Sequence, residues 1–77
     1  MHGRLAEALL YFSDKIFHSD EFEMVLSRQE LGEMTNMAKE SVVRIIGEFE
    51  NENIINATPR SVRILDREKL LIISEKG

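Results

Sequence analysis

The sequence predicts a mainly α-helical domain with a small antiparallel β-sheet, and three observations support this prediction. A capping box opens a short helix, because the Ser27 hydroxyl can accept from the Glu30 amide while the glutamate reaches back to the Ser27 amide. A second helix follows closely, with apolar residues spaced i, i+3, i+4 and i+7 on one face: Val42, Ile45, Ile46 and Phe49. Two short apolar runs flank Pro59 and predict a β-hairpin. Together these features predict a winged helix-turn-helix.

The chain before the capping box is expected to form one helix and one short strand. The predicted helix covers residues 3–17 and has a wide apolar stripe, formed by Leu5, Leu9, Phe12 and Ile16, with Ala6, Leu10 and Phe17 beside it. Residues 22–26 alternate apolar and acidic side chains up to Val25 and predict a strand that leads into the cap. Between the two lie His18, Ser19 and Asp20, and three consecutive loop residues cannot adopt the geometry of a catalytic triad.

The turn of the helix-turn-helix is predicted at Thr35-Asn36, because asparagine tolerates the left-handed conformation that a sharp turn needs. The first helix is expected to begin at Arg28, and the second to run from about residue 38 to residue 50. Gly32 is the small residue expected where the two helices approach closely. The apolar stripe of the first helix is predicted to consist of Leu31 and Met34.

The remaining chain predicts a wing and a final helix. Asn53 is expected to end the second helix in a left-handed conformation. Residues 54–57 and 61–65 predict two short strands joined by Thr58-Pro59-Arg60, where proline favours a turn. Asp66 is predicted to cap a last helix that ends near Ser74. Of its apolar residues we expect Leu70 and Ile73 to point inward, and one of the other two, Leu71 or Ile72, to be exposed or to contact a partner outside this chain.

Composition excludes several classes of protein. Seventy-seven residues form at most one domain, so residues 1–77 are predicted to be a single domain with a modest core. The chain has no cysteine, and therefore no disulfide framework or thiolate metal site. It has no apolar run of about 18 residues that would cross a membrane. No metal-ligand cluster, glycine-rich phosphate loop or paired carboxylate indicates an enzyme. We expect a cytoplasmic protein that is not an enzyme and binds no metal or cofactor.

The net charge of −4 argues against nucleic-acid binding, but the charges are unevenly distributed. Acidic residues gather in two stretches, residues 14–23 and 48–52, whereas residues 53–65 contain two arginines and no acid. Two interpretations stay open. One is a solvated mixed surface, and the other is a basic face on an acidic molecule, formed by Arg28, Lys39, Arg44, Arg60 and Arg63.

Residues 27–46, SRQELGEMTNMAKESVVRII, resemble the DNA-binding motif of the Crp/Fnr family of bacterial transcription regulators. The matching features are the S-R-Q-E-L-G start, the Lys39-Glu40 pair and the run from Val42 through Arg44-Ile45-Ile46. The similarity extends over nearly the whole chain as that family's C-terminal winged-helix domain, and it implies sequence-specific binding to double-stranded DNA. The sequence departs from the family pattern at Asn36, in place of a turn glycine, and at Ala38, in place of a capping serine.

A recognition helix enters the major groove with its N-terminal half, so exposed residues near its start are candidates to read bases. Arg44 can donate two hydrogen bonds to guanine O6 and N7, and Glu40 can accept from a cytosine amine. Lys39 can bind guanine less rigidly, or it can contact a phosphate instead. Val43 can contact a thymine methyl group or remain simply exposed. The competing interpretation for Glu40 and Arg44 is an i, i+4 ion pair on the helix surface. The resemblance implies that this pair reads a half-site containing TGA.

Five residues are predicted to contact phosphates: Arg28, Gln29, Ser41, Arg60 and Arg63. Arg28 and Gln29 match family positions at the N-terminus of the first helix, where free backbone amides favour an anion. Arg60 and Arg63 belong to the wing, for which phosphate contact is expected and base contact is not.

The resemblance also implies partners outside these residues. Full chains of the family carry an N-terminal effector-binding domain and a dimerisation helix that joins a second subunit, and neither has a counterpart here. We therefore expect an excised domain or the product of a truncated gene, with no effector site of its own. The alternative function is a winged-helix module for protein–protein contact without DNA binding. The acidic net charge favours that alternative, as do Leu71 and Ile72.

Overall fold

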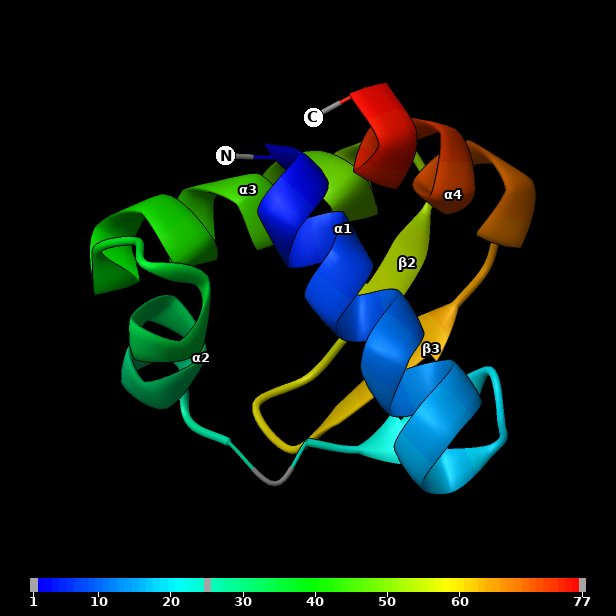
Figure 1. Cartoon of the computed structure of the whole chain (residues 1–77), viewed down its shortest axis with the longest axis horizontal. Coiled ribbons are helices and arrows are strands. Elements are labelled where there is room, and N and C mark those ends of the chain that lie inside the picture. Colours follow the sequence, from blue (N-terminus) through cyan, green and yellow to red (C-terminus); the bar gives the residue numbers. More distant parts are fainter. Residues whose placement is uncertain (1, 25, 77) are drawn as a thin grey trace.

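The computed structural model of the chain describes residues 2–24 and 26–76, and it confirms the predicted fold class (Figure 1). The described elements follow the predicted order. They are α1 (His2–Tyr11), the π-helical η1 (Phe12–Phe17), β1 (Glu21–Glu23), α2 (Arg28–Thr35), α3 (Lys39–Asn51), β2 (Ile55–Ala57), β3 (Ser61–Ile64) and α4 (Arg67–Lys76). The strand predicted over residues 22–26 is shorter, and Val25 lies outside the described residues.

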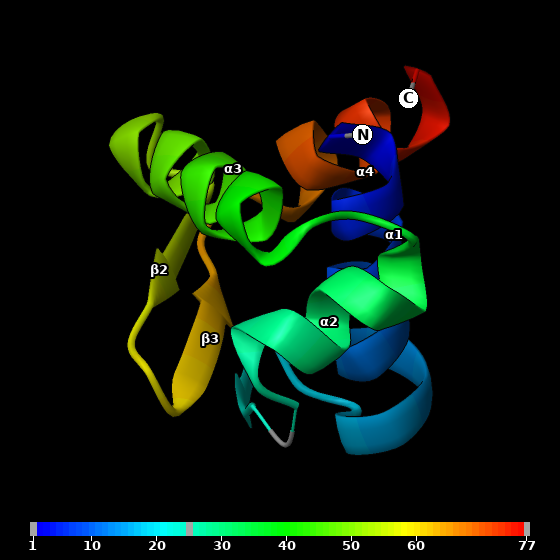
Figure 2. The same cartoon turned by 90° about the vertical axis from the view of Figure 1, so that its left-hand side faces the viewer.

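The three strands form one antiparallel sheet in the order β1-β3-β2. Phe22 on β1 pairs with Val62 on β3, and Ile55 on β2 pairs with Ile64 on β3. These four side chains are buried and form the inner face of the sheet. The β2–β3 hairpin is the predicted wing, and it lies beneath α3 in Figure 2. Pairing between β1 and the wing fixes the hairpin to the body of the domain.

The helix predicted over residues 3–17 changes character after Tyr11. Its last six residues form the π-helical η1, in which each turn contains more residues than an α-turn. The apolar stripe consequently loses its register. Phe12 is buried, but Ile16 is 49 % exposed, so the prediction that Ile16 belongs to the apolar stripe facing the core is wrong. His18 ends the segment in a left-handed conformation, with φ of 53°, and its amide donates to the Ser13 carbonyl.

The core lies between α1, α3 and the inner face of the sheet, with α4 covering α1 (Figures 1 and 2). Asp66 caps α4 as predicted, because its carboxylate accepts from the Lys69 amide at 3.0 Å. Leu70 is fully buried, and both Leu71 and Ile72 are exposed. The helix therefore contributes one completely buried side chain and presents an apolar pair to solvent.

Arg67, at the start of α4, anchors this helix to the start of η1 and to the loop that follows η1. Its guanidinium binds the carboxylates of Asp14 and Asp20 and the hydroxyl of Ser13. These partners come from η1 and from the loop that follows it, so one side chain joins segments about 50 residues apart in the sequence.

The angle between α2 and α3 depends on Gly32. The Met37 amide donates to the Gly32 carbonyl at 2.7 Å, and a Cβ atom built on Gly32 would lie 2.5 Å from the Met37 carbonyl oxygen. Asn36 adopts the predicted left-handed conformation, with φ of 60°. The predicted capping box is also present, with hydrogen bonds of 3.1 Å and 2.9 Å between Ser27 and Glu30.

The apolar stripe predicted for the first helix is only partly correct. Leu31 is fully buried, but Met34 is exposed on the surface of α2. The helix has only eight residues, of which Leu31, Gly32 and Thr35 are buried, and Gly32 makes the close contact with Met37 and Val42. Met34 lies beyond that contact, facing a hollow between α1 and α2.

Replacing Gly32 with alanine should destabilise the domain by about 1–3 kcal/mol, because the backbone carbonyl of Met37 would have to move. Gly47 is the matched control, since a Cβ atom there meets nothing within 4 Å. Gly47→Ala should instead stabilise α3 by up to about 1 kcal/mol. Denaturant unfolding of both variants measures the two effects. Equal behaviour of the variants would contradict the close approach at Gly32.

Candidate nucleic-acid interface

The four predicted base-reading residues share the outer face of α3. Lys39, Glu40, Val43 and Arg44 are all exposed. The opposite face of the helix is buried, as predicted, by Val42, Ile45, Ile46 and Phe49. The side chains that could meet a partner are therefore independent of those that form the core. The domain presents α3 on its surface as a helix-turn-helix protein presents its recognition helix.

Arg44 forms an ion pair, but with a different glutamate from the one expected. Its Nη1 donates to Glu48 Oε2 at 3.2 Å, one turn later, so the predicted pair with Glu40 is wrong. Glutamate on the N-terminal side of its basic partner is normally the better arrangement on a helix. Glu48 is preferred here because a second contact already orients its carboxylate. Among the described residues, the side chain of Glu40 makes no hydrogen bond or ion pair.

The second contact of Glu48 comes from the start of α1. His2 Nε2 lies 2.8 Å from Glu48 Oε1, and the histidine ring meets the ring of Phe49 edge-on at a centroid distance of 6.1 Å. The hydrogen bond with His2 lowers the pKa of Glu48 most strongly, and the charges of His2 and Arg44 lower it further against partial desolvation. Glu48 is consequently ionised at neutral pH and bridges two basic side chains.

The wing is held against the first helix of the motif. Arg28 donates from Nη2 to the Thr58 carbonyl at 3.2 Å, and the Met24 amide donates to the Arg60 carbonyl at 2.6 Å. The turn is tightened by the Thr58 hydroxyl, which accepts from the amides of Arg60 and Ser61. The contact of Arg28 with the wing has no signal in the local sequence, because it joins residues 30 positions apart.

Three predicted contact residues line a notch of about 400 Å³ between the start of α2, the start of α3 and the wing turn. They are Arg28, Gln29 and Lys39, and the notch is completed by Ser27 and Pro59. Ser41 is half-buried on α3, and Arg60 is exposed on the wing turn beside Pro59. Arg63 does not line the notch. It is exposed on the outer face of the sheet, in register with Glu21 on one side and Asn56 on the other.

Residues 3–73 match the sequence model of a family described as the Crp-like helix-turn-helix domain. The chain belongs to this family. The resemblance predicted from residues 27–46 is thereby confirmed, and it extends over almost the whole chain. Membership assigns the chain to the DNA-binding helix-turn-helix domains of transcription regulators.

Named relatives of this Crp-like domain are regulators of transcription. The chain is 32 % identical over 63 residues to the cAMP-activated global transcriptional regulator CRP of Salmonella typhimurium, covering 78 % of this chain and 30 % of the relative. It is 34 % identical over 55 residues to the transcriptional activator protein FnrA of Stutzerimonas stutzeri, covering 71 % of this chain and 22 % of that protein. The chain thus spans less than a third of the length of either relative.

Solved structures show the same fold. A Crp/Fnr-family regulator from Thermus thermophilus aligns with a TM-score of 0.79 at 25 % identity, and the alignment covers 97 % of this chain and 40 % of the Thermus chain. A regulator of the family from Eubacterium rectale aligns with a TM-score of 0.85 at 19 % identity, and the alignment covers 97 % of this chain and 33 % of the Eubacterium chain. The winged helix-turn-helix arrangement is therefore common to the family.

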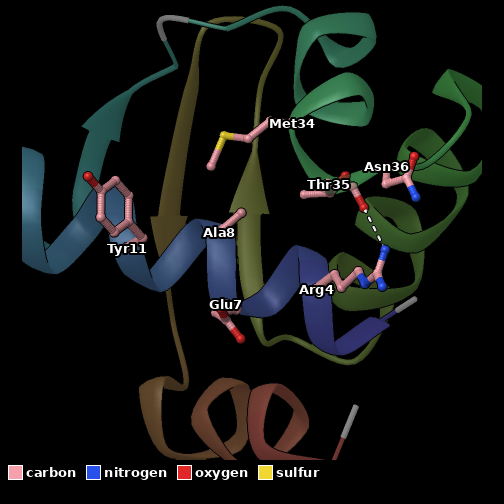
Figure 3. Close-up of a pocket in the computed structure, with 7 residues that line it drawn as sticks. All are labelled: Arg4, Glu7, Ala8, Tyr11, Met34, Thr35 and Asn36. Atoms are coloured by element: carbon pink, nitrogen blue, oxygen red, sulfur yellow. Dashed lines mark hydrogen bonds between the residues drawn. The ribbon is translucent and has the colours of Figure 1, made fainter.

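A second hollow lies on another part of the Crp-like domain. It has a volume of about 450 Å³ and lies between α1 and α2 (Figure 3). Arg4 closes one end by donating to the Thr35 carbonyl at 3.5 Å, and Tyr11 borders the other end. None of the predicted contact residues lines it. It is accordingly separate from the candidate interface.

Within residues 2–24 and 26–76, no three histidine, aspartate or glutamate side chains gather as a metal site would require. In the same part of the chain, no helix has the length and apolar character needed to cross a lipid bilayer. The absence of a metal or cofactor and the cytoplasmic location remain predictions from the sequence.

Serine in place of Ala38 should stabilise the domain by ~1 kcal/mol. Ala38 occupies the N-cap position of α3 with extended backbone angles, φ of −70° and ψ of 151°, and no side chain there accepts from a free amide of the first turn. A serine hydroxyl supplies that acceptor. Thermal unfolding of Ala38→Ser measures the gain, with Ala38→Val as a control that adds bulk without an acceptor. Equal stabilisation by both substitutions would rule out a capping effect.

Proposed function

We propose that this Crp-like domain binds double-stranded DNA sequence-specifically, with α3 in the major groove. The observation that supports this most directly is the outer face of α3. Three side chains that can hydrogen-bond to base edges, those of Lys39, Glu40 and Arg44, are exposed near its start, and none of them contributes to the core. An α-helix fits the major groove, where each base pair presents a distinct pattern of donors and acceptors.

Each residue has a role set by its chemistry. Arg44 donates two parallel hydrogen bonds to guanine O6 and N7, and Glu40 accepts from a cytosine N4 amine. Lys39, the first residue of α3, reaches either a guanine or a phosphate. Val43 is 49 % exposed and offers a methyl contact to thymine. A carboxylate that faces DNA repels phosphates unless it has a base to read, so we assign Glu40 to a base and not to the backbone.

The phosphate backbone is proposed to pass the notch between α2, α3 and the wing. Arg28, Gln29 and Lys39 line that notch, and free amides of the first turn of α2 add favourable donors. Arg60 extends the basic surface along the wing, and Ser41 adds a hydroxyl on α3. Arg63 lies on the sheet opposite Glu21, so we assign it a weaker contact than Arg60.

Partners of the domain are inferred from the longer relatives. The Salmonella relative is named as cAMP-activated, and this chain corresponds to 30 % of it. We infer that the domain acts within a regulator that also has an effector-binding domain and a second subunit. In such a regulator two copies of α3 would read two half-sites, one helical turn of DNA or a multiple of it apart.

The alternative is contact with a protein instead of DNA. Its support is the exposure of Leu71 and Ile72 on α4, at 48 % and 44 %. These residues lie on a different element from the predicted contact residues. The two functions are therefore separable, because substitutions on α3 and on α4 would affect different partners.

Arg44→Ala should abolish preference for one guanine while leaving folding unchanged. Arg44 is exposed, and its ion pair with Glu48 contributes only about 0.2–0.5 kcal/mol to a helix. A bidentate contact to guanine contributes about 1–3 kcal/mol of discrimination. The preferred half-site is first selected from random duplexes, and wild type and variant are then titrated against its single-base changes. A uniform loss across all duplexes would make Arg44 a phosphate contact, and unchanged binding would refute base reading by α3.

Arg60→Ala should weaken binding to every duplex alike and make binding less dependent on salt. A slope of about −0.9 per phosphate contact is expected for log K against log salt, so losing one contact flattens it by about one. Arg63→Ala should have the smaller effect. Lys76→Ala, which removes a basic charge at the end of α4, is the control and should leave the slope unchanged. Loss of affinity confined to one base pair would show that the wing reads bases.

A further inference from the structure

Glu48 connects the start of α1 to the arginine proposed to read a base. One carboxylate oxygen accepts from Arg44 Nη1 at 3.2 Å, and the other lies 2.8 Å from His2 Nε2. Both oxygens are therefore engaged. His2 is itself fixed by edge-on contact with the buried Phe49. The three polar side chains form a chain from α1 to the outer face of α3.

This arrangement holds the arginine without using the part of it that would read a base. Only Nη1 is bound, and Nε and Nη2 have no partner among the described residues. These two nitrogens form one edge of the planar guanidinium, with parallel donors that match O6 and N7 of guanine. Glu48 thus leaves a complete recognition edge free while limiting the conformations of the side chain.

We propose that Glu48 is a positioning residue for Arg44, and that it sets the base specificity of α3 without touching DNA. This inference rests on the proposed function. A free arginine loses side-chain entropy when it docks on a base, and a side chain that is already held loses less. His2 contributes by keeping the carboxylate of Glu48 oriented from α1. A freely rotating glutamate would spend much of its time away from Arg44.

Two other roles for Glu48 predict different effects of its removal on the preference for guanine. An acid on the recognition helix that merely repels phosphates would weaken binding to all duplexes equally. An acid that sequesters Arg44 would lower both affinity and discrimination, so its removal would sharpen preference for guanine. If Glu48 positions Arg44, its removal lowers the preference for guanine. Affinity for duplexes that lack the guanine does not fall, because an acid that repels phosphates has been removed.

The test measures discrimination for the 77-residue chain on duplexes that carry the selected half-site, or that half-site with the Arg44 guanine replaced. Glu48→Ala should reduce the affinity ratio between the two duplexes about two- to tenfold, as expected for freeing one rotamer-rich side chain. Glu33→Ala is the matched control, since it removes an exposed acid from α2 without touching Arg44. It should leave the ratio unchanged. Glu48→Gln keeps a carbonyl oxygen that accepts from Arg44 and should restore most of the ratio.

His2→Ala tests the contact between His2 and Glu48, which is the second contact that orients the Glu48 carboxylate. It should lower the ratio by less than Glu48→Ala does, and the two substitutions combined should lower it no further than Glu48→Ala alone. Thermal unfolding of each variant separates these effects from loss of folding. An unchanged ratio in Glu48→Ala, or a ratio that rises, overturns the inference.

Failure of the proposed function gives a different result. If Arg44→Ala has no effect on the ratio in an otherwise wild-type chain, base reading by Arg44 is wrong and the inference falls with it. If Arg44→Ala lowers the ratio and Glu48→Ala does not, base reading stands and only the positioning role is wrong. A lower ratio in both variants, with rescue by Glu48→Gln, supports the inference.

Discussion

The close approach of Gly32 on α2 to Met37 and Val42 sets how the two helices of the motif meet. A side chain at this position would place its Cβ atom 2.5 Å from the Met37 carbonyl, so only glycine lets the turn close as it does. The turn sets the direction in which α3 leaves α2, and Asn36 supplies its left-handed residue. Because the buried face of α3 is fixed by the core, the same geometry determines which residues point outward. The exposure of Lys39, Glu40 and Arg44 follows from the burial of the opposite face of α3 in the core, and Gly32 sets the direction of that helix relative to α2.

The charges of the domain are arranged so that an acidic molecule still carries a group of basic side chains around the start of α3. The net charge is −4, yet Arg28 and Lys39 line one notch and Arg60 lies on the adjoining wing turn. Several acidic residues are engaged within the protein. Glu48 binds basic side chains, and Asp14 and Asp20 bind Arg67. Distribution of charge therefore matters more than its sum.

Local patterns predicted the elements of the fold, and contacts distant in sequence were the part they missed. The capping box, the left-handed Asn36 and Asn53, and the close contact at Gly32 each depend on a few neighbouring residues, so the sequence revealed them. The π-helical turn that exposes Ile16 has no such signal. Neither does the contact of Arg28 with the wing, nor the preference of Arg44 for Glu48. The last two depend on pairs of residues that only the fold brings together. Arg28 and Thr58 are 30 positions apart, and His2 and Glu48 are 46 positions apart.

We propose that α3, the start of α2 and the wing turn form one surface that meets DNA. Nuclear magnetic resonance of the isotopically labelled chain, titrated with a half-site duplex at low salt, tests it most directly. We expect the signals of Lys39, Arg44 and the wing turn around Arg60 to shift together as duplex is added, while those of Leu71 and Ile72 stay unchanged. Shifts confined to α4 or to the hollow between α1 and α2, or no shifts at all, would contradict it.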